Sequence, residues 1–143
     1  MEARKIITIE DCKALFDGLE RSDAPAGPAL LDAIARELDM RLDHGPRWYL
    51  SEYGYLAKGD IELYGANERQ GLDSDIVRMT RSIRDGMPWT DGYAAIHHIS
   101  DGRYAMFDRS GRVYIADYAS PGFTSANATL LEYIYGLFAP GPS

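Results

Sequence analysis

The chain has one cysteine and no long apolar run, and these shortages exclude several classes of protein. Cys12 has no second cysteine with which to form a disulfide or a zinc-binding pair. The first residues offer only a few apolar side chains before Glu10 and Asp11, so no signal-peptide core is expected. No stretch approaches the roughly 18 apolar residues of a membrane span. We therefore expect a cytoplasmic protein without an internal disulfide.

Positive charge is also scarce. The 143 residues include 15 Lys and Arg against 22 Asp and Glu, which gives a formal net charge of -7. Proteins that bind nucleic acid or anionic lipid need a basic surface, so the composition argues against both partners. A basic protein partner is compatible with this charge. The length fits one domain, since domains usually contain about 100 to 200 residues.

Signatures of catalysis are equally scarce. No GxGxxG, P-loop, GxSxG or HExxH pattern occurs. His97 and His98 are adjacent in a predicted strand, so their side chains are expected on opposite faces, where they cannot share a metal ion. Asp73 and Asp75 lack the glycine and distal glutamate of a calcium loop, which favours a helix cap. We expect no enzyme activity, no cofactor and no metal. A hydrolase with a carboxylate pair across a cleft is a hypothesis that sequence alone does not test.

Apolar residues recur at helical spacing in five segments. Thr8 is a good N-cap for the first segment, and its apolar stripe includes Cys12, which favours a buried structural thiol. Gly54 is expected to end the third helix with a positive φ. The predicted helices cover residues 9–19, 29–40, 47–54, 75–84 and 130–138.

Arg78, Arg81 and Arg84 lie three residues apart on the helix predicted over 75–84. Arginines late in a helix complement its macrodipole, so a solvated row is the favoured interpretation. The alternative is that these arginines bind a phosphate or an acidic partner.

Strand signals dominate the second half of the chain. Apolar and polar residues alternate over 61–64, which suggests a strand. Three segments rich in β-branched and aromatic residues follow over 93–99, 104–107 and 113–118. Asp-Gly and Ser-Gly turns between these three predict an antiparallel meander. Residues 120–127 are expected to be a loop. The order of elements has no βαβ alternation and predicts an α+β single domain, a central, largely antiparallel sheet packed by N-terminal and C-terminal helices.

Several motifs, in this order, resemble the SMI1/KNR4 (SUKH) superfamily. The segment Trp48-Tyr49-Leu50-Ser51-Glu52-Tyr53-Gly54 resembles its "Y..FL..YG" motif, and the meander resembles its "GD.Y.LD...G.VY..DHE" run, although Asp117-Tyr118 lacks the following His-Glu. Further similar segments are 31–42, 60–65 and 130–138, so the resemblance covers about 29–138. It implies an α+β domain with a central sheet packed by helices. It also implies that bacterial members often act as immunity proteins, which bind and neutralise secreted toxins, many of them nucleases. No shared catalytic residue set is carried over.

The leading hypothesis is therefore an immunity protein that binds a cognate polymorphic toxin. The alternative is a cytoplasmic regulatory or scaffold protein that binds a cellular partner. Ten tyrosines outnumber the four phenylalanines and two tryptophans, and tyrosine is enriched at protein interfaces.

Acidic residues outnumber basic ones between residues 60 and 91, and the stretch from 64 to 75 is predicted to be a loop, where recognition residues tend to lie. A solvated loop and a helix cap are the alternative for these residues. The predicted partner contacts, with Tyr118 as an aromatic anchor, are Glu62, Tyr64, Glu68, Asp73, Asp75 and Tyr118.

Overall fold

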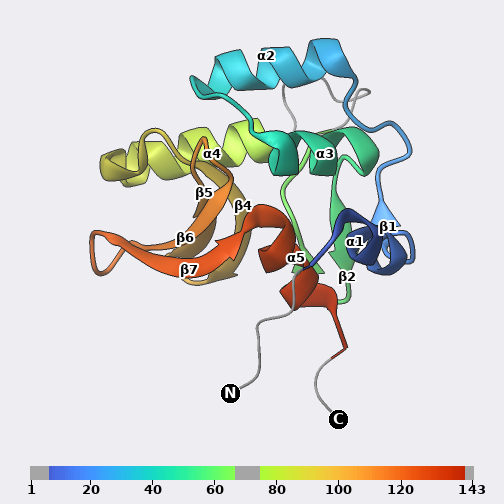
Figure 1. The fold of residues 1–143 in the computed structure, drawn as a ribbon. Helices are drawn as coiled ribbons and strands as arrows, with labels where there is room; N and C mark the ends of the chain where they lie inside the picture. Colours follow the sequence, from blue (N-terminus) through green and yellow to red (C-terminus); the bar gives the residue numbers. More distant parts are fainter. Residues whose placement is uncertain (1–6, 67–74, 141–143) are drawn as a thin grey trace.

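The computed structural model describes residues 7–66 and 75–140 of the chain. Within these residues it has the predicted α+β fold, with five α-helices, and its strands form two antiparallel sheets rather than a single central one (Figure 1). The helices are α1 (Ile9–Phe16), α2 (Pro28–Leu38), α3 (His44–Glu52), α4 (Asp75–Gly86), α5 (Leu130–Phe138) and the 3-10 helix η1 (Pro88–Thr90). The small sheet has the order β1 (Glu20–Arg21), β2 (Leu56–Lys58), β3 (Ile61–Glu62). The larger sheet has the order β4 (Ala94–Ser100), β5 (Arg103–Phe107), β6 (Arg112–Asp117), β7 (Phe123–Thr129).

The helix predictions hold apart from their ends. Thr8 caps α1 in a capping box with Asp11, but the helix ends at Phe16 rather than at residue 19. Gly54 follows the end of α3 with a φ of 73°, as expected. Cys12 is buried as predicted, and burial, with a smaller effect of Asp11, raises the pKa of its thiol to about 11.

The loop predicted over 120–127 is wrong, because residues 123–129 form the edge strand β7 beside β6. Small and polar residues dominate this strand and carry little strand signal, so its pairing with β6 decides its conformation. The strands β1 and β2 were not predicted. They have only two and three residues, too few for alternation to show.

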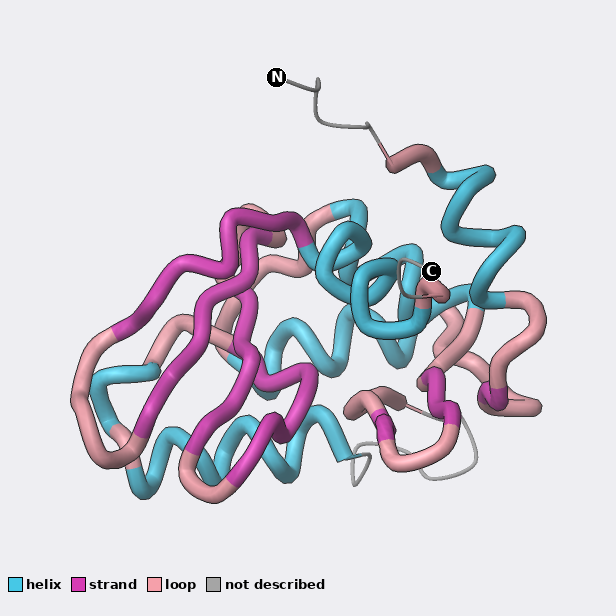
Figure 2. The backbone as a smooth tube through the Cα atoms, turned by 90° about the horizontal axis from the view of Figure 1, so that it is seen from below, coloured by secondary structure: helices cyan, strands magenta, loops and turns pink. Residues whose placement is uncertain are grey.

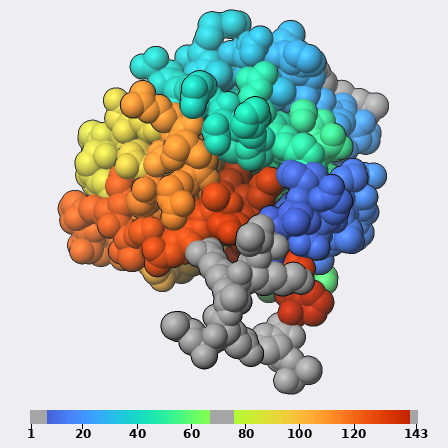
Figure 3. Space-filling view, in the orientation of Figure 1, coloured from blue at the N-terminus to red at the C-terminus, as the bar shows by residue number. Residues whose placement is uncertain are grey.

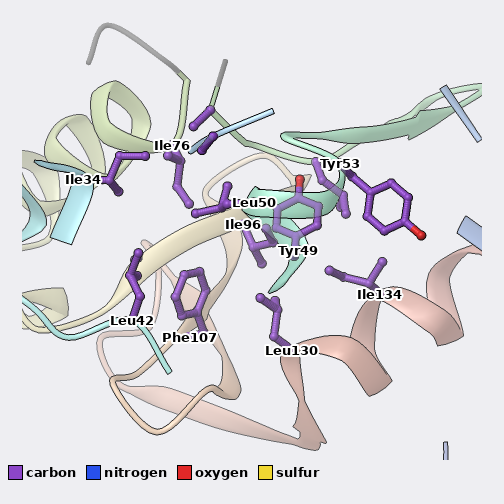
Figure 4. Close-up of a cluster of buried hydrophobic side chains, with 14 of the residues drawn as sticks. Ile34, Leu42, Tyr49, Leu50, Tyr53, Ile76, Ile96, Phe107, Leu130 and Ile134 are labelled. Atoms are coloured by element: carbon purple, nitrogen blue, oxygen red, sulfur yellow. The ribbon is translucent and has the colours of Figure 1, made fainter. Parts of the chain in front are cut away.

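Helices pack against part of each face of the large sheet. One face joins a core to which α1, α2, α3 and α5 contribute, and Ile34, Leu50, Ile96 and Ile134 converge there (Figure 4). The other face carries Met106 and packs against the C-terminal part of α4. In the view from below, the four strands lie beside a helical layer (Figure 2).

The first part of the edge strand β4 is covered. The Thr80 hydroxyl of α4 accepts a hydrogen bond from the Ala95 amide at 2.9 Å. The Tyr64 amide donates to the Ile96 carbonyl at 2.8 Å, and Leu63 forms a bridge with His97. These contacts satisfy an edge that would otherwise expose unpaired backbone groups.

Arg84 joins α4 to two neighbouring segments. Its guanidinium donates to the Leu38 carbonyl at 2.8 Å and to the Tyr93 carbonyl at 2.9 Å, and its side chain is only 14% exposed. Arg81 pairs with Glu37 of α2, whereas Arg78 is exposed. The prediction of a solvated arginine row is therefore wrong for Arg84, because helix periodicity does not reveal carbonyls supplied by distant segments.

Two glycines cross at close range between α3 and the segment that follows β3. A side chain on Gly65 would overlap the Gly54 carbonyl oxygen and approach Tyr55. The Ala66 amide donates to that same carbonyl at 2.8 Å, and the Ile76 amide donates to the Gly65 carbonyl at 3.1 Å. The crossing therefore needs glycine at position 65 and links α3 to the start of α4.

We expect Gly65→Ala to lower the free energy of unfolding by more than about 3 kcal/mol, because a methyl group at the crossing must displace backbone rather than a flexible side chain. Urea unfolding followed by circular dichroism measures this loss. Gly136→Ala in α5 is the matched control, since a methyl group there meets nothing within 4 Å. The control should be neutral or stabilising by up to about 1 kcal/mol. Equal effects of the two substitutions would contradict this account of the crossing.

Arg84→Ala should destabilise the fold by roughly 2 to 4 kcal/mol, since two carbonyls lose charged hydrogen bonds. Arg78→Ala removes the same side chain from an exposed position of the same helix and should change stability by no more than about 0.5 kcal/mol. Thermal and urea unfolding of both variants provide the comparison. A loss for Arg84→Ala as small as that for Arg78→Ala would show that the two hydrogen bonds add nothing to stability.

Candidate partner-binding site

The predicted contact residues lie in different environments in the structure. Glu62 is exposed on β3, and Tyr64 is half-buried against the core. The Tyr64 carbonyl accepts a hydrogen bond from the Tyr49 hydroxyl at 2.7 Å. Glu68 and Asp73 lie outside the described residues, as does the side chain of Asp75, whose backbone begins α4. Tyr118 follows β6.

Glu62 and Tyr118 are not neighbours in the sheets. Leu63, next to Glu62, bridges to His97 in the middle of β4. Tyr118 donates its amide to the Gly102 carbonyl of the β4–β5 turn at 2.8 Å. The strands β4 and β5 therefore lie between the two predicted contacts.

The β4–β5 turn and the end of β6 carry exposed apolar and charged side chains, among them Arg103, whose guanidinium lies 3.9 Å from the Asp117 carboxylate. Among the described residues, the exposed large hydrophobic side chains are Ile9, Ile99 and Tyr118, and the last two flank this turn. Tyr118 is 65% exposed and Ile99 is 36% exposed. We call this surface the turn patch, and it consists of His98, Ile99, Asp101, Tyr104, Asp117 and Tyr118.

The backbone beneath Tyr118 is held in place. The Asp117 carboxylate accepts from the Ala119 amide at 2.9 Å, and the Asp117 carbonyl accepts from Ser120 at 3.2 Å. Gly102 has a φ of 71°, and a side chain there would press on the Tyr118 Cβ at 3.2 Å. Because this backbone is ordered before binding, docking on Tyr118 costs little additional ordering.

His98 and Tyr104 extend the patch across the sheet. The two residues are cross-strand partners, and their ring centroids are 5.0 Å apart. Such aromatic contacts add to the stability of a strand pair. The arrangement places an imidazole and a phenol beside the aromatic anchor, with Asp101 exposed at the turn.

His97 lies on the opposite face and has a different role. Its Nδ1 atom is 2.9 Å from the Tyr133 hydroxyl of α5. Burial, together with neighbouring His98, lowers the pKa of His97, so the ring is neutral at pH 7. Burial raises the pKa of Tyr133 to about 12. The pair is a neutral polar contact between α5 and the sheet. The prediction that His97 and His98 point to opposite faces is confirmed.

No group of three or more His, Cys, Asp or Glu side chains is placed to hold a metal ion within residues 7–66 and 75–140. Over the same part of the chain, no helix is long and apolar enough to cross a membrane. A comparison with protein-family models and with curated proteins finds no match for this chain. The resemblance to the SMI1/KNR4 superfamily therefore stays a prediction.

Sequence reasoning identified only Tyr118 of the turn patch. The signal that was available is the Ile-Ser-Asp-Gly run, in which a large apolar residue stands directly before a turn. Apolar residues next to a tight turn have few neighbours to cover them. The contribution of Tyr104 and His98 depends on strand register, which a single sequence does not specify.

Proposed function

We propose that the protein is an immunity protein that binds a bacterial toxin domain through the turn patch and thereby neutralises it. The observation that carries the proposal is the exposure of Tyr118 and Ile99 beside carboxylates on a rigid turn. Tyrosine at the centre of a patch, with polar groups around it, is the composition of many energetic hot spots.

Charge supports a basic partner. The net charge of -7 attracts a basic domain over long distances, and the exposed Asp101 carboxylate at the rim of the patch raises the rate of association, whereas Asp117 is paired with Arg103. Toxins that degrade nucleic acid have basic surfaces, because they must bind phosphates. Occupation of such a surface by an acidic protein would exclude its substrate.

The test is to express this chain together with the protein encoded by the neighbouring reading frame and to measure growth and copurification. Rescue of growth together with a purified complex is the expected result. Capture of a cellular housekeeping protein without rescue by any neighbouring toxin would replace the immunity proposal with a regulatory or scaffold role.

Tyr118→Ala should weaken toxin binding by about 10- to 100-fold, mainly through faster dissociation, because a buried aromatic anchor is lost from the complex. Its free energy of unfolding should change by no more than about 0.5 kcal/mol, since the side chain is exposed. Surface plasmon resonance gives both rate constants.

Ile9→Ala is the matched control, because Ile9 of α1 is also an exposed large apolar residue, at 40% exposure. The control should bind with unchanged rates. Asp101→Lys should instead slow association and reduce its dependence on salt. Unchanged kinetics for both Tyr118→Ala and Asp101→Lys would place the interface elsewhere on the protein.

A further inference from the structure

A cleft of about 770 Å³ opens at the other end of the large sheet from the turn patch. It lies between the C-terminal end of α2 and the β5–β6 turn, with the Gly92-Tyr93 segment before β4 as a third wall. Cyan α2 and the orange strands meet on the face shown in Figure 3. The volume is in the range of pockets for small molecules, about 300 to 1,000 Å³.

Three arginines line this cleft, which is unusual in a protein of net charge -7. Arg36 and Arg109 are exposed, and their guanidinium groups have no hydrogen-bond or ion-pair partner among the described residues. Arg41 approaches Asp43 only to 4.0 Å, with its side chain 77% exposed. All three guanidinium groups therefore have donors available for a ligand.

One of the two carboxylates in the cleft lining is engaged within the protein. The Asp108 carboxylate accepts from the Ser110 amide at 2.9 Å, the Ser110 hydroxyl at 2.6 Å and the Arg112 amide at 3.1 Å. This aspartate therefore stabilises the β5–β6 turn. Asp39 is the other carboxylate in the lining.

The C-terminal end of α2 would ordinarily present unsatisfied carbonyls with partial negative charge to the cleft. Here the Ala35 carbonyl accepts from Met40 and the Arg36 carbonyl accepts from Asp39, each at 3.1 Å. The Leu38 carbonyl accepts from the Arg84 guanidinium at 2.8 Å. With these carbonyls paired, the charged groups of the lining are the three arginines and the carboxylates of Asp39 and Asp108, a formal excess of one positive charge.

The cleft also has an aromatic and thioether lining. The Tyr93 ring is half-buried and lies against Phe123, with centroids 4.1 Å apart, and edge-on to Tyr114 at 5.7 Å. Met40 is 9% exposed and its sulfur lies 3.8 Å from Arg84. Arg84 bonds to both the α2 wall and the Tyr93 wall, so these two walls are fixed relative to each other.

We propose that this cleft binds a small organic anion whose phosphate or carboxylate groups are held by Arg36, Arg41 and Arg109 and whose apolar part lies against Tyr93 and Met40. Guanidinium groups match both oxyanions through paired donors, which is why arginine serves in such sites. The inference is separate from the proposed function, because cleft and turn patch lie at opposite ends of the sheet.

The experiment is isothermal titration calorimetry of the full chain at about 0.15 M salt, where distant charges are screened. The probes are adenosine diphosphate as an aromatic phosphate, citrate as a carboxylate, inorganic phosphate, and uncharged adenosine. The expected result is saturable binding of the diphosphate or of citrate with a Kd below about 1 mM. The tighter of the two decides whether phosphate or carboxylate is the natural group, and adenosine should not bind.

Arg36→Ala together with Arg109→Ala should weaken binding of that probe by at least about tenfold, since charged hydrogen bonds to the anion are lost. Arg78→Ala together with Arg112→Ala removes the same charge from exposed positions outside the cleft and should leave binding within twofold of the parent chain.

Absence of binding by all charged probes, or equal binding by both double variants, would overturn the proposal. The Arg36 and Arg109 variant should retain toxin binding, and Tyr118→Ala should retain anion binding. Loss of both activities in either variant would also overturn the separation of the two sites.

Discussion

The rest of the structure depends on the crossing of the backbone at Gly54 and Gly65. Gly54 follows the end of α3, and Gly65 follows β3, the last strand of the small sheet. The absence of side chains lets the Ala66 amide reach the Gly54 carbonyl at 2.8 Å. With this contact made, Leu63 and Tyr64 are positioned to pair with β4, and the Tyr49 hydroxyl secures the Tyr64 carbonyl. The large sheet is thus joined to the helices at one defined place.

This anchoring leaves the two ends of the large sheet available for different chemistry. Each end is made by turns, which carry recognition residues on a rigid support. The end formed by the β4–β5 turn carries exposed apolar groups and carboxylates. The end formed by the β5–β6 turn faces α2 across an arginine-lined cleft. Strands of five to seven residues separate the ends by roughly 20 Å, at about 3.3 Å per residue. This separation leaves room for the proposed protein partner and the proposed anion to bind at the same time.

Prediction from sequence succeeded where the signal is local and periodic. The five helices and the meander follow from apolar spacing and from Gly-containing turns, because those features act within a few residues. It failed where a distant segment decides the outcome. Residues 123–129 form the strand β7 because they pair with β6. The Arg84 side chain is held by hydrogen bonds to carbonyls of α2 and of the segment before β4. For the same reason, Tyr118 was the one turn-patch residue among the predicted partner contacts. The positions of Tyr104 and His98 depend on the register of β4 and β5, which a single sequence does not specify.

The central claim is that a protein partner binds at the turn patch and leaves the arginine-lined cleft open. Amide hydrogen exchange of the chain alone and in complex with the proposed toxin partner tests it directly, because exchange reports local protection along the backbone. Slower exchange is expected at residues 98–104 and 117–119 in the complex, with no change at 91–93 and 108–110. Slower exchange around the cleft, with the turn patch unaffected, would contradict it.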